Sequence, residues 1–308
     1  MTRLDSRQPV PEAFRGAIVA LGNFDGFHLG HQAVVGEAVR WARDEGRPVL
    51  VATFDPHPRR FFVPGSPWFR LTTLDQREEL FGAAGADAML VIHFDASLAA
   101  MTGPEWVETM LHRQFGAAGV VTGANFTFGK GRSEPASALA RLGEPFGIRA
   151  RTAPAVLDSG EQVSSTRIRA ALQAGDCETA TRLLSRPFTI RGPVLHGDKL
   201  GRTIGFPTAN LALDHYLRPR FGIYAVRGRL PDGQLHAGAA NLGVRPTFDP
   251  PKELLEPYFF GWSGDLYGHE IDVELHHFLR PEAKFDSLEA LTAQIAADCD
   301  EAKRVLGA

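Results

Sequence analysis

The sequence predicts an α/β protein of two domains, the first with a parallel sheet and the second a small antiparallel barrel or sandwich that ends in a helix. Three observations lead to this fold class. A chain of 308 residues is longer than one core usually organises. Its first half alternates short apolar runs with longer helical patterns, whereas its second half has β-like runs between Gly-rich and Pro-rich turns.

The N-terminal half reads as strands followed by helices, which indicates a parallel sheet with right-handed crossovers. The strands are expected at 17–21, 49–54, 88–92, 119–122 and 148–152, and the main helices at 31–44, 74–83 and 104–114. Ligands of such sheets bind beyond the carboxyl ends of the strands. The chemistry of this half is therefore expected in the loops that follow the strands.

The composition changes after Leu184-Ser185-Arg186-Pro187. We expect one domain over residues 1–186 and another over 187–308. In the second, the strands 223–230 and 235–240 flank a turn at 231–234, and 271–275 alternates as a strand does. A helix of apolar residues at helical spacing follows, which Asp286 or Ser287 could cap.

Composition excludes several classes of protein. A net charge of −3 lacks the excess of Lys and Arg that binds nucleic acid. Cys177 and Cys299 are far apart, which argues against a disulfide framework or a structural zinc site. No stretch approaches the ~20 apolar residues of a membrane span. We expect a soluble, cytoplasmic protein with small-molecule partners and no nucleic-acid or membrane partner; monomer and homo-oligomer both stay open.

The loop after the first strand, residues 22–31, has the pattern G-N-F-D-G-F-H-L-G-H. Glycines permit a tight turn and a close approach of backbone to ligand, and the following helix presents its positive end to a phosphate. His28 and His31 face the same way on an opening helical turn, where both imidazoles could donate to a triphosphate. Ordinary surface or core histidines are the alternative, and two histidines alone are weak grounds for zinc.

Three further segments carry polar groups at or near strand ends. Asp55 and His57, in T-F-D-P-H-P, are expected near the first loop, although a rigid turn would explain them as well. The run 163–169 offers a capping serine, hydroxyls and two arginines at a helix start, which suit the β- and γ-phosphates of ATP. Ordinary helix capping would explain one serine, but it makes no demand for Arg167 and Arg169. The segment 123–132 lacks Walker A spacing; Asn125 and the aromatics Phe126 and Phe128 could hold a planar ring, or the aromatics could be core.

The second module has one segment that suits a nucleotide and a metal ion. Residues 197–210, G-D-K-L-G-R-T-I-G-F-P-T-A-N, join a glycine loop with two cations to a turn that carries a hydroxyl and an amide oxygen. Oxygen ligands of this kind suit Mg²⁺. Phosphoryl transfer to an alcohol also needs a carboxylate near the attacking hydroxyl, and Glu256 is the candidate, although spacing alone does not separate it from Glu253 or Asp265.

Together these segments resemble the bifunctional bacterial riboflavin kinase/FMN adenylyltransferases. The resemblance covers nearly the whole chain through seven motifs in order: G-N-F-D-G-F-H-L-G-H, T-F-D-P-H-P, N-F-T-F-G-K-G-R, S-S-T-R-I-R, G-x-x-x-G-F-P-T-A-N, N-L-G-V-R-P-T-F and L-Y-G with K-F-D-S-L. It implies a Rossmann-like domain of nucleotidyltransferase type that joins AMP from ATP to FMN and releases pyrophosphate. The barrel would transfer the γ-phosphate of ATP to the riboflavin 5′-hydroxyl, with Mg²⁺.

The resemblance also implies roles for particular residues. His28, His31 and Glu256 would be catalytic, Glu256 as the base. ATP in the adenylyltransferase would be bound by Gly22, Phe24, Asp25, Gly26, His28, His31, Ser164, Ser165, Thr166 and Arg167. Flavin would be bound there by Asn125, Asp55 and His57, the kinase nucleotide loop would comprise Gly197, Lys199, Gly201, Gly205 and Pro207, and Mg²⁺ would be held by Thr208 and Asn210.

Two departures from the family pattern keep rival interpretations open. Ser133-Glu134-Pro135-Ala136 replaces the usual Gly-Asp pair after G-K-G-R, and Ser185 stands where the linker usually has Gly. One rival is a kinase whose altered 133–136 loop has cost it the adenylyltransferase; another is a non-catalytic flavin-binding protein. H-x-G-H also occurs in other nucleotidyltransferases and class I aminoacyl-tRNA synthetases, but the chain lacks the basic patches that tRNA requires.

Overall fold

The computed structural model describes residues 1–196, 205–245 and 252–308. They form two compact units. Unit 1 comprises Met1–Pro67 and Thr72–Ser164, and unit 2 comprises Trp68–Leu71 and Ser165–Ala308. The boundary between the two expected domains at 186/187 stays a prediction.

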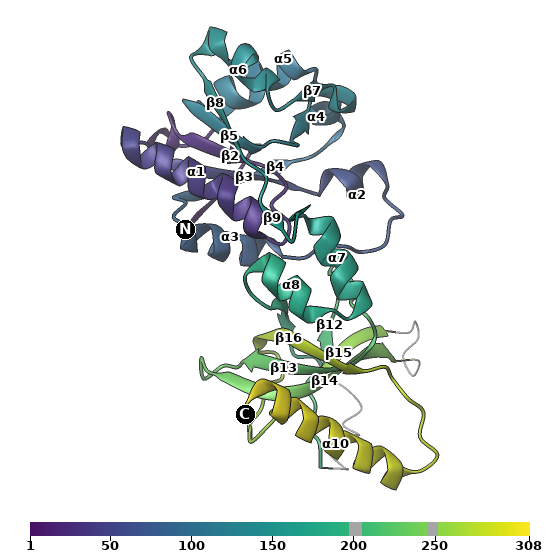
Figure 1. The fold of residues 1–308 in the computed structure, drawn as a ribbon. Helices are drawn as coiled ribbons and strands as arrows, with labels where there is room; N and C mark the ends of the chain where they lie inside the picture. Colours follow the sequence, from purple (N-terminus) through teal and green to yellow (C-terminus); the bar gives the residue numbers. More distant parts are fainter. Residues whose placement is uncertain (197–204, 246–251) are drawn as a thin grey trace. The chain divides into compact units, whose positions relative to one another are not determined.

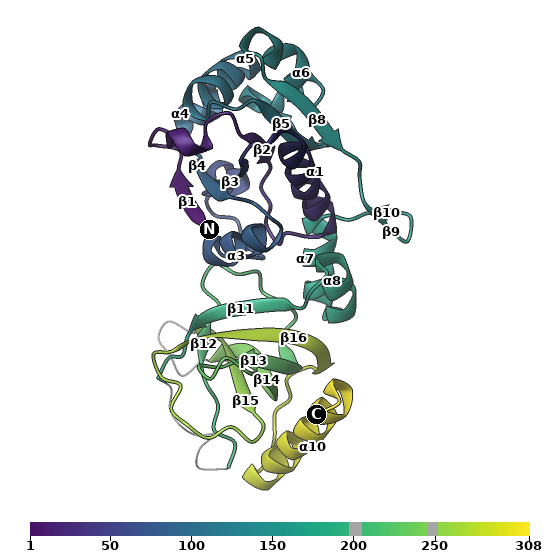
Figure 2. The same ribbon diagram turned by 90° about the vertical axis from the view of Figure 1, so that its left-hand side faces the viewer.

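Unit 1 contains the predicted parallel sheet, which confirms the expected fold class (Figures 1 and 2). Its strand order is β1-β4-β3-β2-β5-β8, and every neighbouring pair is parallel. The strands are β1 (Thr2–Asp5), β2 (Ile18–Leu21), β3 (Val49–Asp55), β4 (Ala88–His93), β5 (Gly119–Gly123) and β8 (Arg149–Ala153). The edge strand β1 is absent from the prediction, since Leu4 is the only apolar residue among its four and gives no alternation to read.

Helices cover both faces of this sheet, so each strand faces two apolar layers. Ile18 and Ala20 of β2 pack in one core with helix α1 (Leu29–Glu45) and with Phe81 of α3 (Leu74–Ala83). Val19 and Leu21 pack in the other core with η2. That second layer comprises α4 (Ala96–Ala100), α5 (Gly103–Trp106), the π-helical η2 (Val107–Gln114) and α6 (Ala138–Gly143). Burial on both faces explains why the strands read as continuous apolar runs.

Short elements complete unit 1. They are η1 (Glu12–Phe14), α2 (Pro58–Phe62), η3 (Lys130–Arg132), η4 (Glu144–Phe146) and two small hairpins, β6 (Thr127–Phe128) with β7 (Glu134–Pro135) and β9 (Leu157–Asp158) with β10 (Glu161–Gln162). Both hairpins lie outside the predicted strands because pairs of two residues leave no periodic signal.

Unit 2 is a nearly closed antiparallel barrel with strand order β11-β16-β13-β14-β15-β12. Its strands are β11 (Phe188–Pro193), β12 (Leu211–Ala212), β13 (Gly222–Arg229), β14 (Leu235–Arg245), β15 (Lys252–Phe259) and β16 (Glu270–Arg280). The N–H of Leu195, just after β11, donates to the carbonyl of Asn210, just before β12, at 2.8 Å. This bond draws the two ends of the sheet together, as the predicted barrel requires.

Helix α10 (Leu288–Leu306) covers the outer face of the barrel beside β13 and β14 (Figure 2). Ser287 is its N-cap, accepting from the Ala290 N–H at 3.1 Å, which resolves the choice between Asp286 and Ser287. Ala302 and Cys299 pack there on Ala225 and Ala239. Arg280 fixes the helix to β16 through two hydrogen bonds to the buried Asp298, at 2.8 and 2.6 Å.

Unit 2 also contains α7 (Ser165–Ala174) and α8 (Cys177–Leu184), which pack on each other. Both cysteines of the chain are buried and unpaired. Burial raises the pKa of Cys177 to about 12 and that of Cys299 to about 11, so both thiols stay protonated at neutral pH. Among the described residues, no helix has the length and apolar character to span a bilayer.

Candidate functional sites

The first candidate site lies at the carboxyl ends of β2 and β5 in unit 1. The chain runs from β2 to β3 on one side, whereas β5 pairs with β2 on the other. Connections therefore leave β2 and β5 in opposite directions, and a crevice at such a switch point is where open α/β sheets bind ligands. The loop 22–28 follows β2, and the turn with Asn125 follows β5.

The loop after β2 has the special backbone that its glycines predicted. Gly26 has φ +86°, and a Cβ on Gly30 would lie 3.1 Å from the His28 ring. Phe24 and Phe27 also have positive φ, at 49° and 41°. Both phenylalanine rings are buried and pack edge-on against Phe81. This packing holds Phe24 and Phe27 at positive φ, a backbone conformation that is unfavourable for residues with a side chain.

His28 and His31 lie together at the start of α1, as predicted. Their rings stack with centroids 3.6 Å apart, and His28 caps the helix by accepting the His31 N–H at its Nδ1, at 3.3 Å. Because Nδ1 is the acceptor, the neutral His28 ring carries its proton on Nε2, which can donate to a ligand. The helix N-terminus adds positive potential, so this corner suits a phosphate.

The beginning of the 163–169 segment lies beside the same helix end. A Cβ on Gly30 would lie 3.5 Å from the Val163 carbonyl, so the residue before Ser164 borders this turn within unit 1. Ser165, Thr166 and Arg167 open helix α7, which belongs to unit 2. Their approach to a triphosphate stays a prediction.

Asp25 is buried beneath the loop. Its carboxylate accepts from Arg77 Nη2 at 3.1 Å and from the Thr72 N–H at 3.1 Å, and both members of the ion pair are 2% exposed. Arg77 also donates to the Thr53 hydroxyl, which itself donates to the Asn23 carbonyl at 2.7 Å. These contacts show that Asp25 fixes the loop. They account for a buried carboxylate at this position without a direct contact to ATP.

Replacing Arg77 by Met should destabilise unit 1 strongly, because it leaves the Asp25 carboxylate buried without its cation. We expect the free energy of unfolding to fall by about 3–5 kcal/mol. Urea unfolding measures it. Arg113→Met is the matched control, since Arg113 pairs with Glu108 at the surface and such pairs contribute about 0–1 kcal/mol. Equal stability of the two variants would contradict a structural role for the Asp25–Arg77 pair.

The predicted flavin residues of unit 1 follow β3 and β5. Asp55 ends β3, and His57 caps α2 by accepting the Arg59 N–H at Nδ1, at 3.1 Å. Asn125 is exposed in the turn after β5. Phe126 and Phe128 stack at 6.1 Å, but Phe128 is buried against Trp106, so it is a core residue.

The departure at 133–136 forms an ordered hairpin. Glu134 and Pro135 of β7 pair with β6, and the Glu134 side chain lies over Gly103, where an added Cβ would lie 2.3 Å away. Lys130 N–H donates to the Met101 carbonyl at 2.6 Å. The altered sequence therefore packs on the start of α5, and the loop is built around Gly103 instead of being lost.

The second candidate site is a row of polar side chains across three strands of unit 2. Glu256 on β15 lies opposite Asn241 on β14. On the other side of β15, Leu211 lies opposite Leu255 and the Ala209 N–H donates to the Pro257 carbonyl at 3.0 Å, which places Asn210 opposite Glu256. Directly opposite residues share a face of the sheet, so the row is Asn210–Glu256–Asn241.

This row lies on the outer face of the barrel. Its neighbours Leu211, Leu255 and Leu242 form the adjacent row and are fully buried in the interior. Thr208 lies two positions before Asn210, in the segment that leads into β12. Its hydroxyl and the Asn210 amide oxygen are oxygen ligands of the kind that Mg²⁺ prefers. The residues present therefore fit the predicted metal ion.

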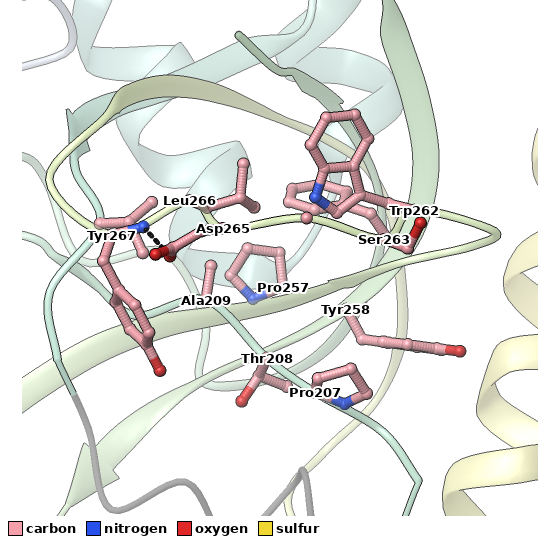
Figure 3. Close-up of a pocket in the computed structure, with 13 residues that line it drawn as sticks. Pro207, Thr208, Ala209, Pro257, Tyr258, Trp262, Ser263, Asp265, Leu266 and Tyr267 are labelled. Carbon is pink, nitrogen blue, oxygen red and sulfur yellow. Dashed lines mark hydrogen bonds between the residues drawn. The ribbon is translucent and has the colours of Figure 1, made fainter. Parts of the chain in front are cut away.

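A pocket of about 410 Å³ is lined by residues next to Asn210 and Glu256 in the chain, although these two do not line it themselves (Figure 3). Thr208 and Ala209 line it from one strand segment, and Pro257 and Tyr258 from β15. In the close-up, Tyr267 and Trp262 lie at opposite ends, with Ala209 and Pro257 between them. The remaining lining residues are Val194, Pro207, Phe259, Ser263, Gly264, Asp265 and Leu266. Its volume and its largely apolar lining are typical of small-molecule sites.

The structure separates the three carboxylates that the sequence left open. Glu253 accepts from Arg218 Nε at 2.6 Å, and Asp265 accepts the Tyr267 N–H at 3.0 Å within its own turn. Glu256 alone of the three lies opposite Asn210. Of the predicted nucleotide loop, Gly205, with φ +85°, and Pro207 are described. Gly197, Lys199 and Gly201 lie outside the described residues.

Comparisons with known proteins assign a family to each half of the chain. The family model for FAD synthetase matches residues 10–167, and the one for riboflavin kinase matches residues 184–306. The bifunctional riboflavin kinase/FMN adenylyltransferase of Pseudomonas fluorescens is 40% identical over 94% of this chain and 93% of its own length. That of Haemophilus influenzae is 36% identical over 94% of both chains.

A solved structure extends the likeness to the fold. A crystal structure from Streptococcus pneumoniae, titled a macrolide-efflux protein, has a TM-score of 0.88 and 31% identity and covers 99% of both chains. Its title names a different activity from that of the curated relatives, and we take from it the shared fold. The two family models, in this order along the chain, and the curated relatives agree with the motifs above. The chain belongs to the bifunctional riboflavin kinase/FMN adenylyltransferase family, with an FAD synthetase domain followed by a riboflavin kinase domain.

Proposed function

We propose that the chain phosphorylates riboflavin to FMN with ATP in its C-terminal domain and adenylylates FMN to FAD in its N-terminal domain, releasing pyrophosphate. The observation that carries this proposal is that each unit has its own site of the required chemistry. The stacked histidines at the α1 N-terminus suit phosphate, and the Asn210–Glu256 row beside a pocket suits transfer to a hydroxyl. Both domains are those of the matching family models.

In the adenylyltransferase, the α1 N-terminus and the His28 and His31 rings stabilise negative charge. The FMN phosphate oxygen attacks the α-phosphorus of ATP, a P–O bond forms, and the bond to the β-phosphate breaks to release pyrophosphate. Donors already in place stabilise the developing charge without reorganising, which is the main source of such catalysis. The Asp25–Arg77 pair holds the loop that positions these donors.

In the kinase, Glu256 accepts the proton of the riboflavin 5′-hydroxyl as its oxygen attacks the γ-phosphorus of ATP. A P–O bond forms, and ADP leaves. Mg²⁺ held by Thr208 and Asn210 would neutralise phosphate charge. The strand register keeps Asn210 beside Glu256, so the metal site and the base are adjacent through the backbone alone.

The reactions use small-molecule substrates and need no nucleic-acid or membrane partner. The net charge of −3 also disfavours nucleic-acid binding. The proposed location is the cytoplasm, which the two buried, unpaired cysteines support.

Separate assays of the two half-reactions on the full chain test the proposal. Riboflavin, ATP and Mg²⁺ should yield FMN and ADP, and FMN, ATP and Mg²⁺ should yield FAD and pyrophosphate, both separated by chromatography. EDTA should stop the kinase. FMN formation without FAD formation would favour the rival in which only the kinase is active, although the ordered 127–135 hairpin counts against it. If neither FMN nor FAD formed, the rival of a non-catalytic flavin-binding protein would remain.

A further inference from the structure

Asn241 is the polar neighbour of Glu256 on strand β14 of the proposed kinase site. It lies on β14 directly opposite Glu256, on the face that also carries Asn210. Side chains directly opposite on neighbouring strands have Cβ atoms about 4.5–5.5 Å apart. Glu256 is therefore flanked by an asparagine on each side, of which Asn210 is the predicted metal ligand.

The Asn241 side chain carries an unsatisfied acceptor. Its Oδ1 is buried and accepts no hydrogen bond from any residue in 1–196, 205–245 or 252–308. A buried carbonyl without a donor costs about 1–3 kcal/mol, and nearly all buried polar groups in folded proteins are paired. An acceptor left open beside a proposed catalytic carboxylate indicates a ligand that brings a donor.

A hydroxyl group fits this donor, because Asn241 lies opposite the carboxylate that is proposed to take a hydroxyl proton. Phosphate oxygens only accept, so the triphosphate does not satisfy Asn241, and the oxygens that suit the metal lie on the other side of Glu256, at Asn210 and Thr208. Glu256 and Asn241 are two acceptors side by side, which match two neighbouring hydroxyls of one polyol. Riboflavin carries such a polyol, the ribityl chain.

We propose that Asn241 Oδ1 accepts a hydrogen bond from the ribityl 4′-hydroxyl and so aligns the neighbouring 5′-hydroxyl with Glu256. The proposal rests on the kinase function proposed above. It makes Asn241 a specificity-determining residue, because a substrate that lacks the 4′-hydroxyl leaves a buried acceptor unpaired. Sites built to pair a hydroxyl reject the analogue without it strongly.

A cycle of two enzymes and two substrates tests the contact. Wild type and Asn241→Ala are assayed with riboflavin and with its 4′-deoxy analogue. With riboflavin, the variant should lose about 10- to 100-fold in kcat/KM. Wild type should lose a similar factor with the analogue, and the variant should then show no further loss. Equal losses from the mutation with both substrates, or full wild-type activity with the analogue, would overturn the contact.

Matched variants separate this contact from an effect on folding. Asn241→Leu keeps the side-chain shape and removes the acceptor, so it should repeat the result of Asn241→Ala. Leu235→Ala, at the exposed start of the same strand, should leave both substrates unaffected. A changed Mg²⁺ requirement in Asn241→Leu, with the substrate cycle additive, would assign Asn241 to the metal and overturn the proposal. Wild type inactive on riboflavin would refute the kinase function itself, which is a different outcome.

Discussion

Replacing Glu256 by Gln should reduce FMN formation by about two to four orders of magnitude, the usual contribution of a general base. Gln keeps the shape of the side chain and its place opposite Asn210 and Asn241, but it cannot take the hydroxyl proton. FAD formation from supplied FMN should stay at the wild-type rate, because that chemistry belongs to unit 1. Steady-state assays of both half-reactions on the one variant measure the two effects.

Glu253→Gln is the matched control, since it changes the same residue type on the same strand. Glu253 lies three positions from Glu256, on the opposite face of the strand, and already pairs with Arg218. Glu253→Gln should lower the free energy of unfolding by no more than a partly exposed ion pair contributes, and FMN formation should continue at the wild-type rate. Equal loss in Glu253→Gln and Glu256→Gln would reject Glu256 as the specific base, and loss of FAD formation in Glu256→Gln would reject the division of activities between domains.

The fold could be read from the sequence wherever burial imposed a pattern. Strands β2 to β5 are buried on both faces and therefore appear as apolar runs. Helix α3 was predicted at its observed bounds, and in the structure Thr73 and Gln76 form a capping box at its start. The edge strand β1 and the two-residue hairpins carry no such pattern. The hairpins are too short for a period to show, and β1 depends on a partner distant in the chain, since Thr2–Asp5 pairs with Ala88–Val91.

The candidate sites divide in the same way. His28 and His31 were found because they lie three positions apart at the start of one helix, and their contact needs only local geometry. Arg77 was missed, since it lies 52 residues from Asp25 and looks like any surface arginine of a helix. In the sequence, Asn241 is part of the motif N-L-G-V-R-P-T-F, but nothing there assigns it a role. Its meaning comes from strand register, which pairs it with Glu256 and which no local pattern discloses.

The Asp25–Arg77 pair and the His28–His31 stack together explain how unit 1 can present donors to a phosphate without reorganising. The ion pair fixes the loop from below through Thr72, whose hydroxyl accepts the Gly26 N–H at 3.0 Å. The loop places His28 at the N-terminus of α1, where its ring both caps the helix and stacks on His31. Stability of the buried pair and activity at the helix end are therefore coupled.

Replacing His28 should reduce FAD formation by about 10²–10³-fold, the usual effect of removing one donor that stabilises charge in the transition state. His28→Ala removes the donor and also the helix cap, which is worth about 0.5–2 kcal/mol of stability. His28→Ser separates the two effects. Serine is a good N-cap, so this variant should keep the stability of unit 1, but its short side chain does not carry a donor to the position of the imidazole Nε2.

The measurements are FAD formation from FMN and ATP, FMN formation from riboflavin, and thermal unfolding of each variant. His28→Ala and His28→Ser should lose FAD formation alike and keep FMN formation. His112→Ala is the control, because His112 is an exposed histidine of the same unit whose ring stacks on Phe146 at 4.7 Å, away from the strand ends. If His28→Ser made FAD at the wild-type rate, the capping role would be the whole contribution of His28, and the phosphate site would have to rest on His31 and the helix end alone.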